Sequence, residues 1–288
     1  MTLTEIRAAL DSRGLRPLKQ LGQNFLHDQN LTRWLAEHAV AGIDPGATVV
    51  EIGPGLGALT AILLEKNLRL IALEKDRGLC VFLREHFAPE IARGGLDLRE
   101  GDALEMLPKL GVAPAVICGN LPYYISTPLL MECLRLPGPP DLPGPPDLPG
   151  LPGLPGTPAR LFFLVQKEVG QRLASLPGNK TYGALSVLVQ VGYDVSVVRT
   201  LPGSVFYPPP EVASVAVQLT PRAEPMVAPA DRERFAAVVQ RGFSQRRKKL
   251  SNLLNTDDGR RAEHLSPAEW VELWRQVEGR DASPFTPH

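Results

Sequence analysis

The sequence predicts an α/β protein in which a mostly parallel sheet is followed by a small all-helical domain. Short apolar runs that suit buried strands alternate with helical patterns over residues 48–165, as in sheets covered by helices. A glycine-rich segment at 53–57 follows the first apolar run directly and leads into a helical pattern. After Pro221 the composition changes, and the patterns that follow are helical. We therefore expect a large domain over residues 1–222 and a small one over 223–288.

Composition and charge exclude several classes of protein. The 288 residues carry 31 basic and 31 acidic side chains, so nucleic-acid binding would depend on where the charges lie and not on a net excess. No signal-peptide pattern precedes Asn24, and no run of about 18 apolar residues occurs, so we expect a cytoplasmic protein with no membrane partner. The three cysteines form no CxxC pair and the five histidines show no metal-ligand spacing, so we expect no metal site.

Two helical patterns precede the first strand. They cover residues 4–12 and 29–41, and Asp28 can cap the second helix. The segment Gln23-Asn24-Phe25-Leu26 between them has no packing pattern, so the simpler interpretation is a loop before a capped helix.

The first strand, glycine loop and helix form one unit. Residues 48–52 read as a strand, and glycines 53, 55 and 57 let the backbone approach a ligand at the start of a helix over 58–66. The next strand, 70–73, is closed by Glu74, 21 residues after Gly53, and a carboxylate there suits a ribose diol. The GxGxG spacing with this acid favours S-adenosylmethionine over NAD, whose sites show GxGxxG. Glu74 and Lys75 could equally form a surface ion pair.

Two further strands end in polar residues. After a helix over 76–85, the strand 96–100 runs into Asp102, which either accepts from an adenine amine or, by default, caps the following turn. The strand 115–118 leads to Asn120 at its carboxyl end, where open α/β sheets bind ligands. Asn120 offers a fixed acceptor, and Pro122 can hold the Leu121 carbonyl outward as a second one. Tyr123 offers a face for stacking a base. A strand followed by an Asn-Pro turn is the plainer interpretation.

The middle of the chain contains a repetitive insertion and the remaining strands. Residues 136–158 repeat Leu-Pro-Gly units, so we expect an extended or disordered insertion. It either enlarges a surface loop or binds a partner that recognises polyproline. The patterns that follow predict a strand over 161–165, helices over 166–174 and 182–191, and strands over 193–201 and 213–219 that add an antiparallel pair at the sheet edge. In the loop between these last two strands, Phe206 either stacks on a base opposite Tyr123 or is buried under the loop.

The carboxy-terminal region combines helices with a basic cluster. Helical patterns cover 231–241 and 267–277. Between them lie four consecutive cations, Arg246, Arg247, Lys248 and Lys249. They indicate either phosphate contact or a solvated face.

Seven motifs in order resemble the ribosomal RNA adenine dimethyltransferase family, in particular its small-subunit branch. They are QNFL at 23–26, EIGPGLGALT at 51–60, LEKD at 73–76, GDAL at 101–104, NLPYYIST at 120–127, VFYPPPEV at 205–212 and FSQRRKKL at 243–250. The resemblance implies a Rossmann-like S-adenosylmethionine-dependent methyltransferase sheet and a small all-α carboxy-terminal domain that contacts RNA. It implies dimethylation of two adjacent adenosines in the 3′-terminal hairpin loop of 16S rRNA, within an immature 30S subunit, by a monomer.

The same resemblance assigns roles to individual residues. It implies that the cofactor is held by Asn24, the Leu26 backbone, Gly53, Gly55, Glu74, Asp102 and Asn120. It implies that Asn120 and the Leu121 carbonyl hold the target amine while Tyr123 and Phe206 stack the flipped base. Two other classes stay open. One is a large-subunit adenine methyltransferase conferring macrolide resistance, against which FSQRRKKL argues. The other is a non-catalytic assembly factor, against which the glycines, Glu74 and Asn120 argue.

Overall fold

The computed structural model describes residues 1–122, 125–133 and 158–281, which form two compact units. Unit 1 comprises Met1–Lys167 and Ser196–Ala223, and unit 2 comprises Glu168–Val195 and the described residues from Glu224 onward. This division groups residues by contact, and the functional domains expected at 1–222 and 223–288 stay a prediction. Tyr123 and all but the last residue of the insertion at 136–158 lie outside the described residues.

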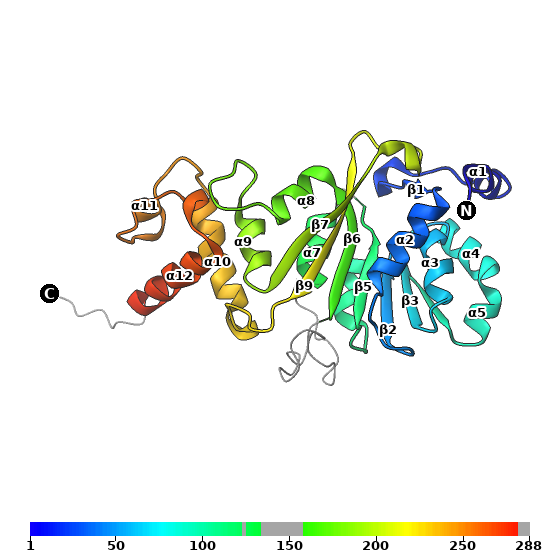
Figure 1. The fold of residues 1–288 in the computed structure, drawn as a ribbon, viewed down its shortest axis with the longest axis horizontal. Coiled ribbons are helices and arrows are strands. Elements are labelled where there is room, and N and C mark those ends of the chain that lie inside the picture. The colour runs from blue at the N-terminus through cyan, green and yellow to red at the C-terminus, as the bar shows by residue number, and fades with distance from the viewer. Residues whose placement is uncertain (123–124, 134–157, 282–288) are drawn as a thin grey trace. The chain divides into compact units, whose positions relative to one another are not determined.

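A seven-stranded mixed sheet is the framework of the molecule. Its order is β4-β3-β2-β5-β6-β9-β7 (Figure 1). The strands span Leu96–Glu100 (β4), Arg69–Glu74 (β3), Thr48–Ile52 (β2), Val116–Asn120 (β5), Arg160–Gln166 (β6), Ser214–Pro221 (β9) and Tyr193–Leu201 (β7). The first five pair in parallel, and β9 pairs antiparallel with β6. The predicted α/β fold is therefore confirmed, including two strands added beyond the fifth.

The central parallel strands, β2 and β5, are apolar and buried. Val49, Val50, Val116, Ile117 and Cys118 are all fully buried, as is expected where both faces of a parallel sheet are covered. The chain proceeds from β2 to β3 and β4 in one direction and from β5 to β6 in the other. Strand order therefore reverses between β2 and β5, and ligands bind in the crevice at the carboxyl end of such a switch point.

Helices precede and connect the strands, and among the described residues three more follow the last strand. They span Leu3–Asp11 (α1), Gln29–Ala39 (α2), Ala58–Leu64 (α3), Arg77–His86 (α4), Ala88–Ala92 (α5), Ala103–Met106 (α6), Ser126–Cys133 (α7), Lys167–Leu173 (α8), Ala184–Gln190 (α9), Arg232–Phe243 (α10), Leu250–Leu254 (α11) and Pro267–Asp281 (α12). Short 3₁₀ turns span Lys19–Leu21, Leu107–Lys109, Gly203–Val205, Pro229–Asp231 and Ala262–His264. The sequence analysis did not predict α5, α6 or α11, each of which has at most five residues.

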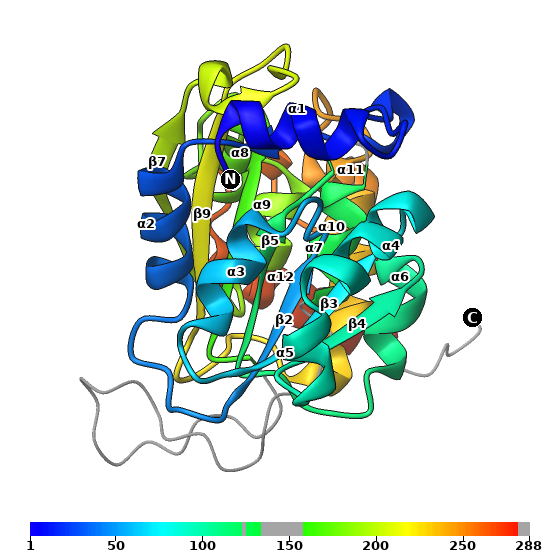
Figure 2. The same ribbon diagram turned by 90° about the vertical axis from the view of Figure 1, so that its right-hand side faces the viewer.

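In unit 1, α2 and α3 lie side by side (Figure 2). They contribute to one apolar cluster with the sheet, in which Leu35 and Leu63 join Val49, Cys118 and Phe162. Asp28 caps α2 as predicted, because its Oδ1 accepts a hydrogen bond from the Leu31 amide at 2.9 Å.

A second, two-stranded sheet was not predicted. Phe25–Leu26 (β1) pairs antiparallel with Phe206–Tyr207 (β8), and Leu26 lies opposite Phe206. The sequence analysis assigned both segments to loops, because two-residue strands show no alternation that a sequence pattern could reveal. This pairing brings the segment that contains Asn24 next to the loop that contains Phe206.

Unit 2 has a core of its own. Tyr182, Phe235 and Trp270 are buried together, and the Tyr182 hydroxyl donates to the Leu265 carbonyl at 2.8 Å.

In the described part of the chain, none of the helices combines the length and the hydropathy needed to cross a membrane.

Candidate functional site

The carboxyl ends of the central parallel strands surround a cavity in unit 1. The cavity has an empty volume of about 640 Å³ including its solvent-open part. Its lining includes six of the predicted cofactor residues, Asn24, Gly53, Gly55, Glu74, Asp102 and Asn120. The stretch of residues 18–26, called here the N-terminal segment, contributes Leu21 to Phe25 to the same lining. The remaining predicted cofactor residue, Leu26, lines an adjoining cavity together with Asn24 and Asn120.

Glycines allow the close approaches on which this arrangement depends. Gly55 has φ +62°, and a Cβ there would lie 3.1 Å from the Phe25 ring. Gly119 has φ +154°, and a Cβ there would lie 2.2 Å from the Ile52 carbonyl oxygen of the neighbouring strand. Side chains at these positions would therefore strain the loop and separate β2 from β5 at the switch point.

Glu74 is a buried carboxylate held by backbone amides. The side chain is 6% exposed. One oxygen accepts from the amides of Lys75 and Asp76 at 2.8 and 2.9 Å, and the other accepts from the Gly55 amide at 3.1 Å. The alternative of a surface pair with Lys75 is therefore wrong. Burial raises the pKa of Glu74 to about 7, although the backbone hydrogen bonds act in the opposite direction.

Asp102 has partners on both carboxylate oxygens. Oδ1 caps α6 by accepting from the Leu104 amide at 2.9 Å, so the predicted capping role is confirmed. Oδ2 accepts from Lys75 Nζ at 2.7 Å, an ion pair that the sequence did not reveal. Partial burial acts to raise the pKa of Asp102, but the hydrogen bonds from Lys75 and Leu104 lower it below its ordinary value.

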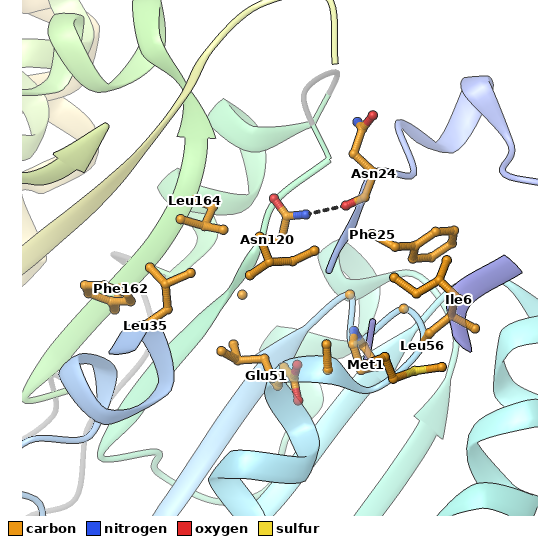
Figure 3. Close-up of a pocket in the computed structure, with 17 residues that line it drawn as sticks. Met1, Ile6, Asn24, Phe25, Leu35, Glu51, Leu56, Asn120, Phe162 and Leu164 are labelled. Atoms are coloured by element: carbon orange, nitrogen blue, oxygen red, sulfur yellow. Dashed lines mark hydrogen bonds between the residues drawn. The ribbon is translucent and has the colours of Figure 1, made fainter. Parts of the chain in front are cut away.

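The orientation of the Asn120 amide is set by a backbone carbonyl. Asn120 is the last residue of β5, and its Nδ2 donates to the Asn24 carbonyl oxygen at 2.9 Å (Figure 3). Because the nitrogen is directed at this acceptor, Oδ1 is presented as a hydrogen-bond acceptor. Asn24 itself is held by donation from its Nδ2 to the Gly22 carbonyl at 3.0 Å. The geometry therefore provides a fixed acceptor of the kind that an amino group requires.

The residues predicted to hold and stack the target base are placed as follows. Leu121 is 1% exposed, and its amide donates to the Leu164 carbonyl at 3.0 Å. Phe206 is 3% exposed and packs in the core cluster of unit 1, as the burial alternative expected. Tyr123 lies outside the described residues. The roles of these residues in base stacking and amine binding stay predictions.

The adjoining cavity contains a second buried carboxyl, that of Glu51 (Figure 3). Glu51 is 1% exposed and accepts a 2.7 Å hydrogen bond from the Thr60 hydroxyl. Burial raises its pKa to about 7. Glu51 was not among the predicted site residues, although an acidic residue inside a buried strand is a visible signal.

The four consecutive cations of unit 2 do not share one environment. Arg246 donates to the carbonyls of Lys180 and Tyr182 at 2.6 and 3.0 Å, and its Nε lies 3.3 Å from Glu263. Arg247, Lys248 and Lys249 are exposed and form no ion pair with any residue that the structure describes. Arg246 therefore has a structural role, and the other three cations are available to anions.

The chemistry of the main cavity fits S-adenosylmethionine. Two carboxylates face it, and Lys75, the one cation among the described lining residues, is already paired with Asp102. Such a lining suits a ligand that carries hydroxyl and amine donors and a positive charge, and it lacks the cations that a pyrophosphate attracts. No group of three or more His, Cys, Asp or Glu side chains in the described ranges is arranged to hold a metal ion.

Comparison with known proteins gives one family match and several close relatives. Residues 15–276 match the model of a family described as ribosomal RNA adenine dimethylase. A curated protein of Moorella thermoacetica, Ribosomal RNA small subunit methyltransferase A, is 38% identical over 94% of this chain and 96% of its own length. The Geobacter sulfurreducens protein of the same name is 39% identical over 90% of this chain and 95% of its own length.

Solved structures share the fold. A dimethyladenosine transferase from Plasmodium falciparum is 20% identical with a TM-score of 0.71, and the match covers 89% of this chain and 98% of that one. The 23S rRNA methyltransferase ErmE is 21% identical with a TM-score of 0.62, and the match covers 88% and 100% of the two chains.

Proposed function

The chain belongs to the ribosomal RNA adenine dimethylase family, and from this premise we propose how its residues bind cofactor and target. The protein is an S-adenosylmethionine-dependent rRNA adenine dimethyltransferase that acts on 16S rRNA. The finer assignment, dimethylation of two adjacent adenosines in the 3′-terminal hairpin loop, is part of the proposal. The proposal also includes an immature 30S subunit as partner, action as a monomer, and a cytoplasmic location.

The main cavity would hold the cofactor through Glu74, Asp102, the glycine loop and Asn24. Glu74 would accept the ribose hydroxyls, because its carboxylate is already oriented by three backbone amides. Asp102 would accept the adenine amine beside its ion pair with Lys75. The glycine loop and Asn24 would line the methionine end. When bound, S-adenosylmethionine supplies a methyl group on a sulfonium, which is an activated leaving group.

The single observation that carries the proposal is the fixed amide of Asn120. Its Nδ2 is tied to the Asn24 carbonyl, so Oδ1 can accept an N–H of the target adenosine and align its nitrogen lone pair. Alignment of this kind can contribute roughly 7–11 kcal/mol when reacting groups are held in line, so no strong general base is needed. The Leu121 carbonyl would accept the second N–H and Tyr123 would stack the base, whereas the Phe206 ring lies buried in the core cluster of unit 1.

Substitution of Asn120 tests this proposal. Asn120→Ala removes the acceptor, and Asn120→Asp keeps an acceptor but removes the donor to Asn24. We expect both variants to bind small subunits with affinities close to wild type, and the rates are measured at saturating S-adenosylmethionine because Asn120 also lines the cofactor cavity. We expect Asn120→Ala to lower the single-turnover rate of methyl transfer by about 10²–10³, the effect of deleting one polar group that holds the reacting centre. Wild-type rates in Asn120→Ala would refute the role assigned to this amide.

The large-subunit alternative is not favoured. The fold is shared with ErmE at 21% identity, but the curated relatives that cover almost the whole chain act, by name, on the small subunit. Exposed Arg247, Lys248 and Lys249 would supply phosphate contacts to the rRNA in either case.

A further inference from the structure

We infer that Gln23 is a positioning residue for the cofactor, acting through Asp76 on the Glu74 carboxylate. The inference rests on the proposed function, in which Glu74 receives the ribose. Gln23 lines the main cavity but was assigned no role beyond its place in the QNFL motif.

The Gln23 side chain has both ends engaged. Its Oε1 accepts from the Leu18 amide at 2.8 Å, and its Nε2 donates to Asp76 Oδ2 at 2.8 Å. Leu18 lies at the start of the N-terminal segment and Asp76 lies just beyond β3, so this amide joins two parts of the cavity wall that are 53 positions apart in sequence. Gln23 is therefore a bridge between elements and not a freely rotating loop residue.

Asp76 links Gln23 to Glu74, the carboxylate that faces the cavity. Its Oδ1 caps α4 by accepting from the amides of Gly78 and Leu79 at 2.8 and 3.1 Å. Its own amide donates to Glu74 Oε1 at 2.9 Å. Asp76 thus holds Gln23 and the start of α4 through its side chain, and it orients Glu74 through its backbone amide.

The N-terminal segment also reaches the other side of the site. Its Asn24 carbonyl accepts from Asn120, and its Leu26 pairs with Phe206. Loss of the Gln23 bridge would free one end of this segment, and the cofactor would then have to order it on binding at a cost in affinity. Loss of the bridge should weaken cofactor binding and leave rRNA binding unchanged, because Gln23 contacts neither the acceptor for the target amine nor the exposed cations of unit 2.

A donor–acceptor exchange tests the bridge directly. Gln23→Glu places a carboxylate against Asp76, and Asp76→Asn places two amide donors against each other while Asn keeps the cap on α4. We expect each single variant to raise the Kd for S-adenosylhomocysteine about tenfold, which corresponds to losing one hydrogen bond to a charged group. The double variant Gln23→Glu/Asp76→Asn re-forms the bond between residues 23 and 76 with donor and acceptor exchanged, while the Leu18 amide still donates to residue 23. We expect its Kd to return to within about twofold of wild type.

A matched control and two kinetic readouts separate positioning from general destabilisation. Arg13→Met removes the 2.7 Å ion pair with Glu85, which also joins residues near the N-terminus to α4 but does not reach Glu74. We expect this control to bind the cofactor like wild type. We expect Gln23→Glu to raise the KM for S-adenosylmethionine while kcat at saturating cofactor and the Kd for small subunits stay unchanged.

The outcomes distinguish the inference from the proposed function. Wild-type cofactor affinity in both single variants, or a double variant no better than the singles, would overturn the role of Gln23. A wild-type protein that binds cofactor but does not methylate small subunits would instead overturn the proposed function, and the cofactor affinities of the variants would still decide the inference.

Discussion

The buried carboxyl of Glu51 predicts a specific pH dependence of folding stability. In the folded protein its pKa is raised from 4.5 to about 7, because burial disfavours the charged form. Below pH 4.5 the carboxyl is protonated in both folded and unfolded chains and contributes no difference. Between pH 4.5 and 7 the unfolded chain releases the proton and the folded chain keeps it, so stability falls as pH rises and then levels off.

The magnitude follows from the pKa difference. Each pH unit corresponds to about 1.4 kcal/mol. The rise from 4.5 to about 7 therefore makes the free energy of unfolding roughly 3 kcal/mol smaller at pH 8 than at pH 4.5 on account of Glu51. Glu51→Gln removes the ionisation but keeps a side-chain oxygen that can accept from Thr60.

Urea unfolding of both proteins at several pH values measures this contribution. We expect the stabilities of wild type and Glu51→Gln to be similar near pH 4.5 and to diverge by up to about 3 kcal/mol in favour of the variant at pH 8. Glu74 titrates in the same range and its charge also raises the pKa of Glu51, so the comparison is repeated in a Glu74→Gln background. A difference between the two proteins that is independent of pH would refute the reasoning.

Three further predictions concern the cofactor site, the packing of α2 and the RNA surface. Because the pKa of Glu74 is about 7, its carboxylate becomes protonated and loses acceptor capacity as pH falls. We expect calorimetry to show about tenfold weaker S-adenosylhomocysteine binding at pH 6 than at pH 8. In Glu74→Gln we expect the affinity to be independent of pH. Arg160 Nη1 donates at 2.9 to 3.0 Å to three carbonyls at the end of α2, those of His38, Ala39 and Ala41. Arg160→Met should therefore lower the free energy of unfolding by about 2–3 kcal/mol without changing cofactor affinity. Lys248→Ala should reduce the slope of log affinity for rRNA against log salt concentration by about 1, with unchanged thermal stability. Arg246→Ala should lower the thermal stability, because Arg246 donates to two backbone carbonyls. Equal effects of these two substitutions would contradict the distinction.

Features with a strong local signal could be predicted from the sequence. The strands over 48–52 and 96–100 were correctly bounded, because each is an apolar or alternating run that a glycine follows directly. Asp28 and Asp102 were correctly identified as candidate caps, because the capping preference acts between neighbouring residues.

Features that depend on contacts distant in sequence could not be predicted. The pairing of β1 with β8, the ion pair between Lys75 and Asp102, and the bridge from Gln23 to Asp76 each join residues whose proximity exists only in the fold. The environment of Glu74 was left open for the same reason, since the amide of Gly55, 19 positions earlier, helps to bury and orient it. Arg246 was grouped with its basic neighbours because the carbonyls that it holds belong to residues 180 and 182.

The central claim is that this site dimethylates adenosines of small-subunit rRNA, and mass spectrometry of the product tests it most directly. Wild-type protein and S-adenosylmethionine would be incubated with small subunits from a strain that lacks the modification, with naked large-subunit rRNA in parallel. We expect two adjacent dimethyladenosines in the 3′-terminal hairpin loop of 16S rRNA and no modification of the large-subunit RNA. Methylation confined to large-subunit RNA, or cofactor binding without methyl transfer to either RNA, would contradict the account.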